Sequence, residues 1–64
     1  MEFEALVRRV RGEFLEMPGL SLTFPQAQRL WGLREDVCRK VVETLVVRDF
    51  LRYTRDGTIA RTAD

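Results

Sequence analysis

The chain has 64 residues and a formal net charge of +1, which is enough for one small domain and too little charge to indicate nucleic acid. Hydrophobic residues make up 45% of it and charged residues 33%, a composition that excludes a disordered chain. The single cysteine, Cys38, and the lack of histidine exclude an internal disulfide framework and the usual Cys/His zinc sites. We therefore expect no metal, no cofactor and no enzymatic activity.

The N-terminal stretch MEFEALVRRV carries acids where a signal peptide carries bases. No segment reaches the ~20 apolar residues that a membrane-spanning helix needs. A lone cysteine fits a reducing compartment. We expect one domain over residues 1–64, a cytoplasmic location and no membrane partner.

Residues 2–17 are predicted to form the first helix, since four apolar residues recur there at helical spacing: Phe3, Val7, Val10 and Phe14. Glu4 precedes Arg8 by four residues, the order that favours an ion pair on a helix. Gly12 weakens the helix by roughly 1 kcal/mol relative to alanine, and we interpret it as a close-approach point for a neighbouring helix. Pro18 in the MPGLS stretch ends the helix.

Residues 20–22 alternate apolar and polar side chains and are predicted to form a short strand. Thr23 and Gln26 then match a capping box, with Pro25 tolerated in the first helical turn. Gly32 is expected to end this second helix in a left-handed conformation. Its buried side is predicted to contain Ala27, Leu30 and Trp31.

The third helix is predicted to start at Arg34 or Glu35 and to end near Arg48. Its first turn holds Glu35 and Asp36, where the helix dipole favours acids. Asp49 follows the helix at a position where a left-handed residue is useful. The inward-facing stripe is predicted to contain Cys38, Val41, Val42, Leu45 and Val46.

The last stretch, FLRYTRDGTIART, is predicted to form a hairpin in one of two registers. A two-residue loop at Asp56-Gly57 pairs Thr54 with Ile59, whereas a three-residue loop with Gly57 left-handed pairs Thr54 with Thr58. We prefer the three-residue loop, because it places three core-type side chains on one face: Leu51, Tyr53 and Ile59.

One shared core is expected, and its predicted members are Leu6, Val7, Val10, Phe14, Leu22, Ala27, Leu30, Trp31, Leu33, Cys38, Val42, Leu45, Leu51, Tyr53 and Ile59. On this basis we interpret Cys38 as a buried thiol rather than a redox sensor, and Trp31 as a structural residue rather than a platform for base stacking. For Gln26 and Gln28, contact with phosphates and simple solvation remain equal alternatives.

The element order and the residues that carry it resemble the winged helix-turn-helix family. The matching residues are Leu22-Thr23, Ala27 through Leu33, Cys38, Val42, Leu45, Phe50-Leu51 and Asp56-Gly57. The likeness extends over nearly the whole chain and is strongest to a group of short, mostly uncharacterised bacterial proteins. It implies a mainly α fold with a small antiparallel β-sheet, in the order α-β-α-α-β-β.

The resemblance also implies a DNA-binding module, such as a small transcriptional regulator. The third helix, residues 34–48, would enter the major groove of duplex DNA, and the hairpin, residues 50–62, would act as the wing. A homodimer on paired half-sites is the second partner that it implies. The residues that it assigns to the DNA contact are Arg34, Glu35, Asp36, Arg39, Lys40, Arg52, Thr54 and Arg55.

An alternative hypothesis is a protein-interaction or self-association module that does not bind DNA. The basic residues would then form an ordinary solvated surface balanced by acids. The motivation is a group of valines too large for one inward stripe to cover, which would leave an apolar patch exposed: Val37, Val41, Val42, Val46 and Val47.

Overall fold

The computed structural model describes residues 2–62. Met1, Ala63 and Asp64, at the ends of the predicted domain, lie outside the described residues. Three helices and three short antiparallel strands follow one another in the predicted order α-β-α-α-β-β. Their bounds are α1 Phe3–Glu16, β1 Ser21–Leu22, α2 Phe24–Trp31, α3 Glu35–Val47, β2 Leu51–Tyr53 and β3 Ile59–Arg61. The fold is therefore mainly helical with a small sheet, as expected.

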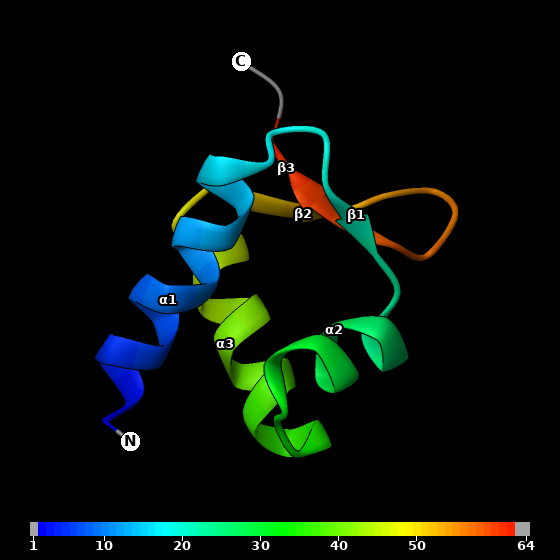
Figure 1. The fold of residues 1–64 in the computed structure, drawn as a ribbon. Helices are drawn as coiled ribbons and strands as arrows, with labels where there is room; N and C mark the ends of the chain where they lie inside the picture. The colour runs from blue at the N-terminus through cyan, green and yellow to red at the C-terminus, as the bar shows by residue number, and fades with distance from the viewer. Residues whose placement is uncertain (1, 63–64) are drawn as a thin grey trace.

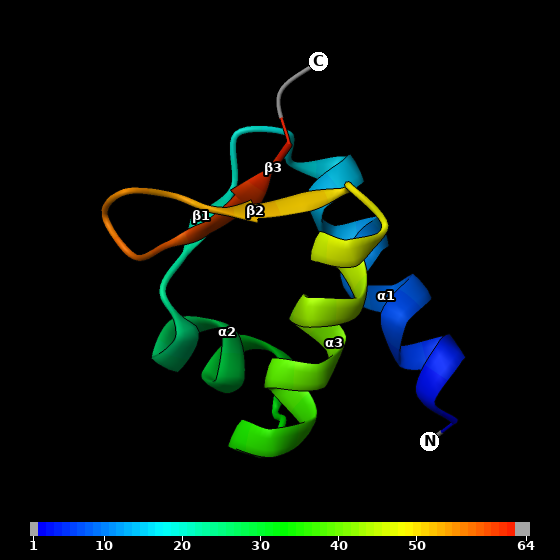
Figure 2. The same cartoon turned by 180° about the vertical axis from the view of Figure 1, so that it is seen from behind.

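Helix α3 lies between the other two helices. It packs against α1 on one side and α2 on the other, and both views show this order (Figures 1 and 2). The sheet has the strand order β1-β3-β2 and lies at the end of the molecule where α3 finishes. The loop between β2 and β3 projects beyond the helices on the same side as α2 (Figure 1).

The core lies where the inner faces of the helices meet the sheet. Phe14 of α1 and Trp31 of α2 are in edge-to-face contact there, with ring centroids 6.1 Å apart. Cys38 and Trp31 are buried, which confirms their interpretation as core residues. The buried apolar residues are Leu6, Val7, Val10, Phe14, Ala27, Trp31, Cys38, Val41, Val42, Leu45, Leu51 and Ile59.

Two predicted core residues are exposed instead. Leu30 is 52% exposed and Tyr53 46% exposed. In the short helix α2, Ala27 and Trp31 are four residues apart and form the buried side, which turns Leu30 toward a shallow groove beside β1. Tyr53 shares a sheet face with Leu51, but it lies farther along the hairpin and stacks on the half-buried Phe24 at the start of α2.

The interpretation of Gly12 as a close-approach point is wrong. A Cβ atom at this position would meet nothing within 4 Å besides the backbone of its own helix and its chain neighbours. Gly12 points away from the buried side, because the buried residues of α1 are Leu6, Val7, Val10 and Phe14. The glycine therefore contributes no packing that another residue would disturb.

The hairpin has the preferred three-residue loop. Tyr53 pairs with Ile59 across the strands, and the Thr54 N–H donates to the Thr58 carbonyl at 2.8 Å. Gly57 has φ +82°, the left-handed conformation that this loop requires. The register was thus predictable from the demand that Leu51 and Ile59 face the same core.

The five valines behind the alternative hypothesis are mostly covered. Val41 and Val42 are fully buried, Val37 and Val46 are half-buried, and Val47 is 85% exposed. Only Val47 among the five is largely open to solvent. No helix within residues 2–62 is long and apolar enough to cross a membrane.

We predict that Gly12→Ala raises the free energy of unfolding by about 1 kcal/mol, because alanine restricts the unfolded chain and has room in the helix. Urea denaturation followed by the fluorescence of the buried Trp31 measures it. Gly32→Ala is the matched control, and it should lower the free energy of unfolding by about 1 kcal/mol, because Gly32 has φ +65°. If both substitutions act in the same direction, this interpretation of the two glycines is wrong.

Candidate nucleic-acid interface

The corner between α2 and α3 is built from local interactions. The Thr23 hydroxyl accepts the Gln26 N–H at 3.2 Å, and the Gln26 side-chain oxygen accepts the Thr23 N–H at 2.9 Å, which confirms the capping box. Gly32 ends α2 at φ +65° and ψ +38°. The Gln28 carbonyl accepts the N–H groups of both Gly32 and Leu33, so the chain turns within two residues and α3 begins at Glu35.

The first two turns of α3 present polar side chains to solvent. Cys38, Val41 and Val42 face the core, and the opposite side of the helix is exposed. Arg34 occupies the cap position and makes no side-chain hydrogen bond to the helix, because arginine has no acceptor. The exposed charged residues of this segment are Arg34, Glu35, Asp36, Arg39, Lys40 and Glu43.

Acids pair with two of the three cations on this segment. Arg39 lies 3.2 Å from the Glu35 carboxylate, and Arg34 lies 3.7 Å from Asp36. Lys40 has no ion-pair partner among the residues that the structure describes. Since three cations face three acids, the outer face of α3 carries no net charge.

Arg39 is also held by an aromatic residue. Its guanidinium carbon lies 5.2 Å from the centroid of the Phe24 ring. Tyr53 stacks on the same ring with centroids 6.3 Å apart, so that α2, α3 and β2 meet at Phe24. Burial, with a further contribution from the Glu43 carboxylate, raises the pKa of Tyr53 above its ordinary value. The phenol therefore remains a hydrogen-bond donor at neutral pH.

The hairpin presents two arginines to solvent. Arg52 and Arg55 are exposed, and neither forms an ion pair within residues 2–62. Thr54 is half-buried, and its hydroxyl lies 2.6 Å from the hydroxyl of Thr58 and also accepts the Thr58 N–H. Ser21 of β1 donates to the Thr58 hydroxyl at 2.8 Å. The Thr54 hydroxyl is thus engaged inside the hairpin, while the arginines are not.

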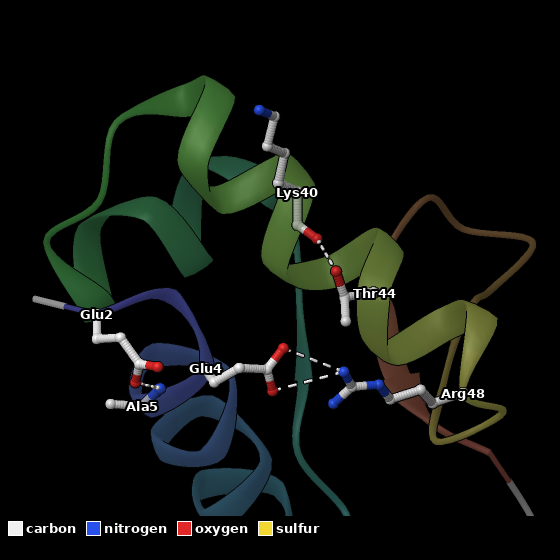
Figure 3. A network of polar contacts seen from close by, with 6 residues as sticks. All are labelled: Glu2, Glu4, Ala5, Lys40, Thr44 and Arg48. Atoms are coloured by element: carbon white, nitrogen blue, oxygen red, sulfur yellow. Dashed lines mark hydrogen bonds and ion pairs between the residues drawn. The ribbon is translucent and has the colours of Figure 1, made fainter.

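The other end of α3 is tied to α1. The Arg48 guanidinium donates to the Glu4 carboxylate at 3.2 Å, and the Thr44 hydroxyl donates to the Lys40 carbonyl at 2.7 Å. The Lys40 ammonium points away from this network (Figure 3). A shallow groove of about 530 Å³ lies along α3 here, and Phe3 of α1 and Val47 contribute to its lining.

The structure places the predicted site residues in two groups. Five lie at the start of α3 and three on the hairpin, and Phe24 connects the groups through Arg39 and Tyr53. From the sequence, Phe24 has no predicted role and Tyr53 is predicted in the core. The pattern does not indicate their contact, because Phe24 is simply the residue after the cap Thr23, and Tyr53 has the spacing of a core residue.

No family model, curated protein or solved structure matches this chain. Within the described part of the chain, no three acidic or cysteine side chains are grouped so that they could hold a metal ion.

We predict that stability falls at alkaline pH because of Cys38. Burial raises the pKa of its thiol above the ordinary value of 9.0, and the nearby Arg39 opposes this in part. The thiol of the unfolded chain ionises first. The stability that the protonated, buried thiol contributes is therefore complete below about pH 9, and it is lost as pH rises through the higher pKa of the folded protein. Denaturation across this range should show a smaller decline for Cys38→Ala. An identical decline in both proteins would contradict this role.

Proposed function

We propose that this chain is a winged helix-turn-helix module that binds duplex DNA in the cytoplasm, as a small transcriptional regulator. The start of α3 would lie in the major groove, and the hairpin would contact the backbone or the minor groove. The observation that carries the proposal is the combination of an exposed polar helix start with exposed hairpin arginines, Arg52 and Arg55.

The start of α3 and the hairpin differ in net charge. Because α3 presents a neutral outer face, attraction to the phosphates would come mainly from Lys40 and the hairpin. The pairs Arg39–Glu35 and Arg34–Asp36 are exposed, and such pairs contribute only about 0–1 kcal/mol. A phosphate or a guanine edge can therefore replace the carboxylate as the partner of either arginine.

The acids at the helix start have a role in folding. Arg34 provides no cap, and Glu35 and Asp36 compensate by their charge at the positive end of the α3 dipole. The Asp36 side chain also accepts the Val37 N–H at 2.9 Å. These carboxylates would oppose phosphates nearby, which predicts modest affinity for random sequence and a larger share of selectivity from base contacts.

We predict that Arg52→Ala/Arg55→Ala lowers the slope of log affinity against log salt by about two, because each of these arginines would neutralise one phosphate. Fluorescence anisotropy with a labelled random duplex across a salt series measures it. Arg8→Ala/Arg9→Ala on α1 is the matched control, because it removes the same charge from exposed positions outside the interface.

Equal slopes for these two double variants would show attraction by overall charge alone and would contradict the assignment of the hairpin. Absence of binding by the unsubstituted protein at low salt would refute DNA binding itself.

We predict that Glu35→Gln/Asp36→Asn raises the affinity for random duplex roughly fivefold, because two carboxylates close to phosphate are removed. The double substitution should also lower the free energy of unfolding by about 1 kcal/mol, because the two charges no longer stabilise the helix dipole. Glu13→Gln/Glu16→Gln on α1 is the control of equal charge. If the control raises the affinity as much, the start of α3 does not lie at the DNA.

A further inference from the structure

Phe50, half-buried at the base of the hairpin, makes cation–π contacts with two guanidinium groups from distant parts of the chain. The Arg11 guanidinium carbon of α1 lies 5.1 Å from the ring centroid, and that of Arg61 of β3 lies 5.4 Å from it. The ring attracts both cations through its negative faces. Neither arginine forms an ion pair with an acid in residues 2–62. Within residues 2–62, two like charges are thus held together with no carboxylate in ion-pair contact.

Arg8 adds a third cation to this surface. It lies three residues before Arg11, so the two are neighbours on α1. The sequence pairs Arg8 with Glu4, but in the structure the Glu4 carboxylate contacts Arg48 of α3 at 3.2 Å (Figure 3). Arg8 is therefore exposed and has no ion-pair partner in the described part of the chain.

Apolar atoms lie beside these charges. Leu15, four residues after Arg11 on the same stripe of α1, is 42% exposed. Glu13 and Glu16 lie on other sides of α1, because two or five residues from Arg11 is not a neighbouring position on a helix. Two exposed acids are adjacent in sequence to these residues, Glu16 after Leu15 and Asp49 before Phe50, against the three arginines. Positive charge therefore prevails over a partly apolar face.

We propose that this surface, formed by Arg8, Arg11, Leu15, Phe50 and Arg61, binds an acidic amphipathic segment of a partner protein. Carboxylates of the partner would contact the guanidiniums, and its apolar side chains would cover Leu15 and the edge of Phe50. A DNA backbone offers phosphates and sugars but no apolar side chains that could cover these two residues. Charge complementarity combined with apolar contact therefore favours a protein segment.

This surface differs from the proposed DNA interface. It lies on α1 and the base of the hairpin, whereas the start of α3 and the projecting loop lie on the α2 side (Figure 1). The inference does not depend on DNA binding, and both partners would have room at the same time.

A helical peptide of repeated Glu-Glu-Leu units is a suitable probe, and its binding is measured by NMR titration of isotope-labelled protein. We predict that the largest changes in amide chemical shift occur at Arg11, Phe50 and Arg61. The variant Arg11→Ala/Arg61→Ala should weaken peptide binding roughly tenfold. Arg9→Ala/Arg29→Ala is the control of equal charge and should leave binding nearly unchanged. If the Arg11→Ala/Arg61→Ala variant does not fold, Arg8→Glu replaces it. This substitution leaves the Phe50 contacts intact and should also weaken binding.

Three results would overturn the inference. The first is no binding of the peptide by the unsubstituted protein. The second is an equal effect of the Arg11→Ala/Arg61→Ala variant and its control. The third is a decrease in duplex DNA binding by that variant as large as its decrease in peptide binding, which would assign the surface to nucleic acid.

Discussion

The left-handed turn at Gly32 sets the direction of α3, and the whole candidate interface depends on that direction. The turn is closed by two N–H groups that donate to the Gln28 carbonyl. Trp31, one residue earlier, is fixed by its contact with Phe14 of α1. Because the corner is anchored in the core, α3 can bury Cys38 and Val42 and still present its first turns to solvent. A side chain at Gly32 would strain this backbone conformation.

Under the proposed function, the same helix start has to satisfy two opposing electrostatic demands. A helix that begins at a residue without a capping side chain gains from acids in its first turn, and a surface that approaches phosphates gains from bases. The chain places Glu35 and Asp36 beside Arg34 and Arg39, so the exposed face is neutral and each arginine has a weak local partner. Net positive charge then lies elsewhere, on the hairpin and around Phe50. This separation of charges underlies both proposals.

Features determined by local sequence could be predicted. The capping box at Thr23, the left-handed Gly32 and the hairpin register each depend on a few adjacent residues, and the structure has all three. The left-handed Asp49, with φ +65°, belongs to the same class. Turn and cap geometry is specific enough to read without knowledge of tertiary contacts.

Features that depend on neighbours from other elements could not be predicted. Leu30 fits an apolar stripe but is exposed, because the buried side of α2 contains only Ala27 and Trp31 and Leu30 points away from it. Glu4 has a favourable partner within its own helix but contacts Arg48 of α3 instead. For the candidate site, the sequence identified the charged residues but neither their ion pairs nor the contact of Arg39 with Phe24.

The most direct measurement of the proposed function is an NMR titration of the isotope-labelled protein with a short random duplex at low salt. We expect changes in amide chemical shift at residues 34–40, which are the cap and the first turns of α3, and at the hairpin loop around Arg55, with the outer face of α1 unaffected. Shifts confined to α1, or no shifts at saturating DNA, would contradict the assignment of α3 and the hairpin as a DNA-binding surface.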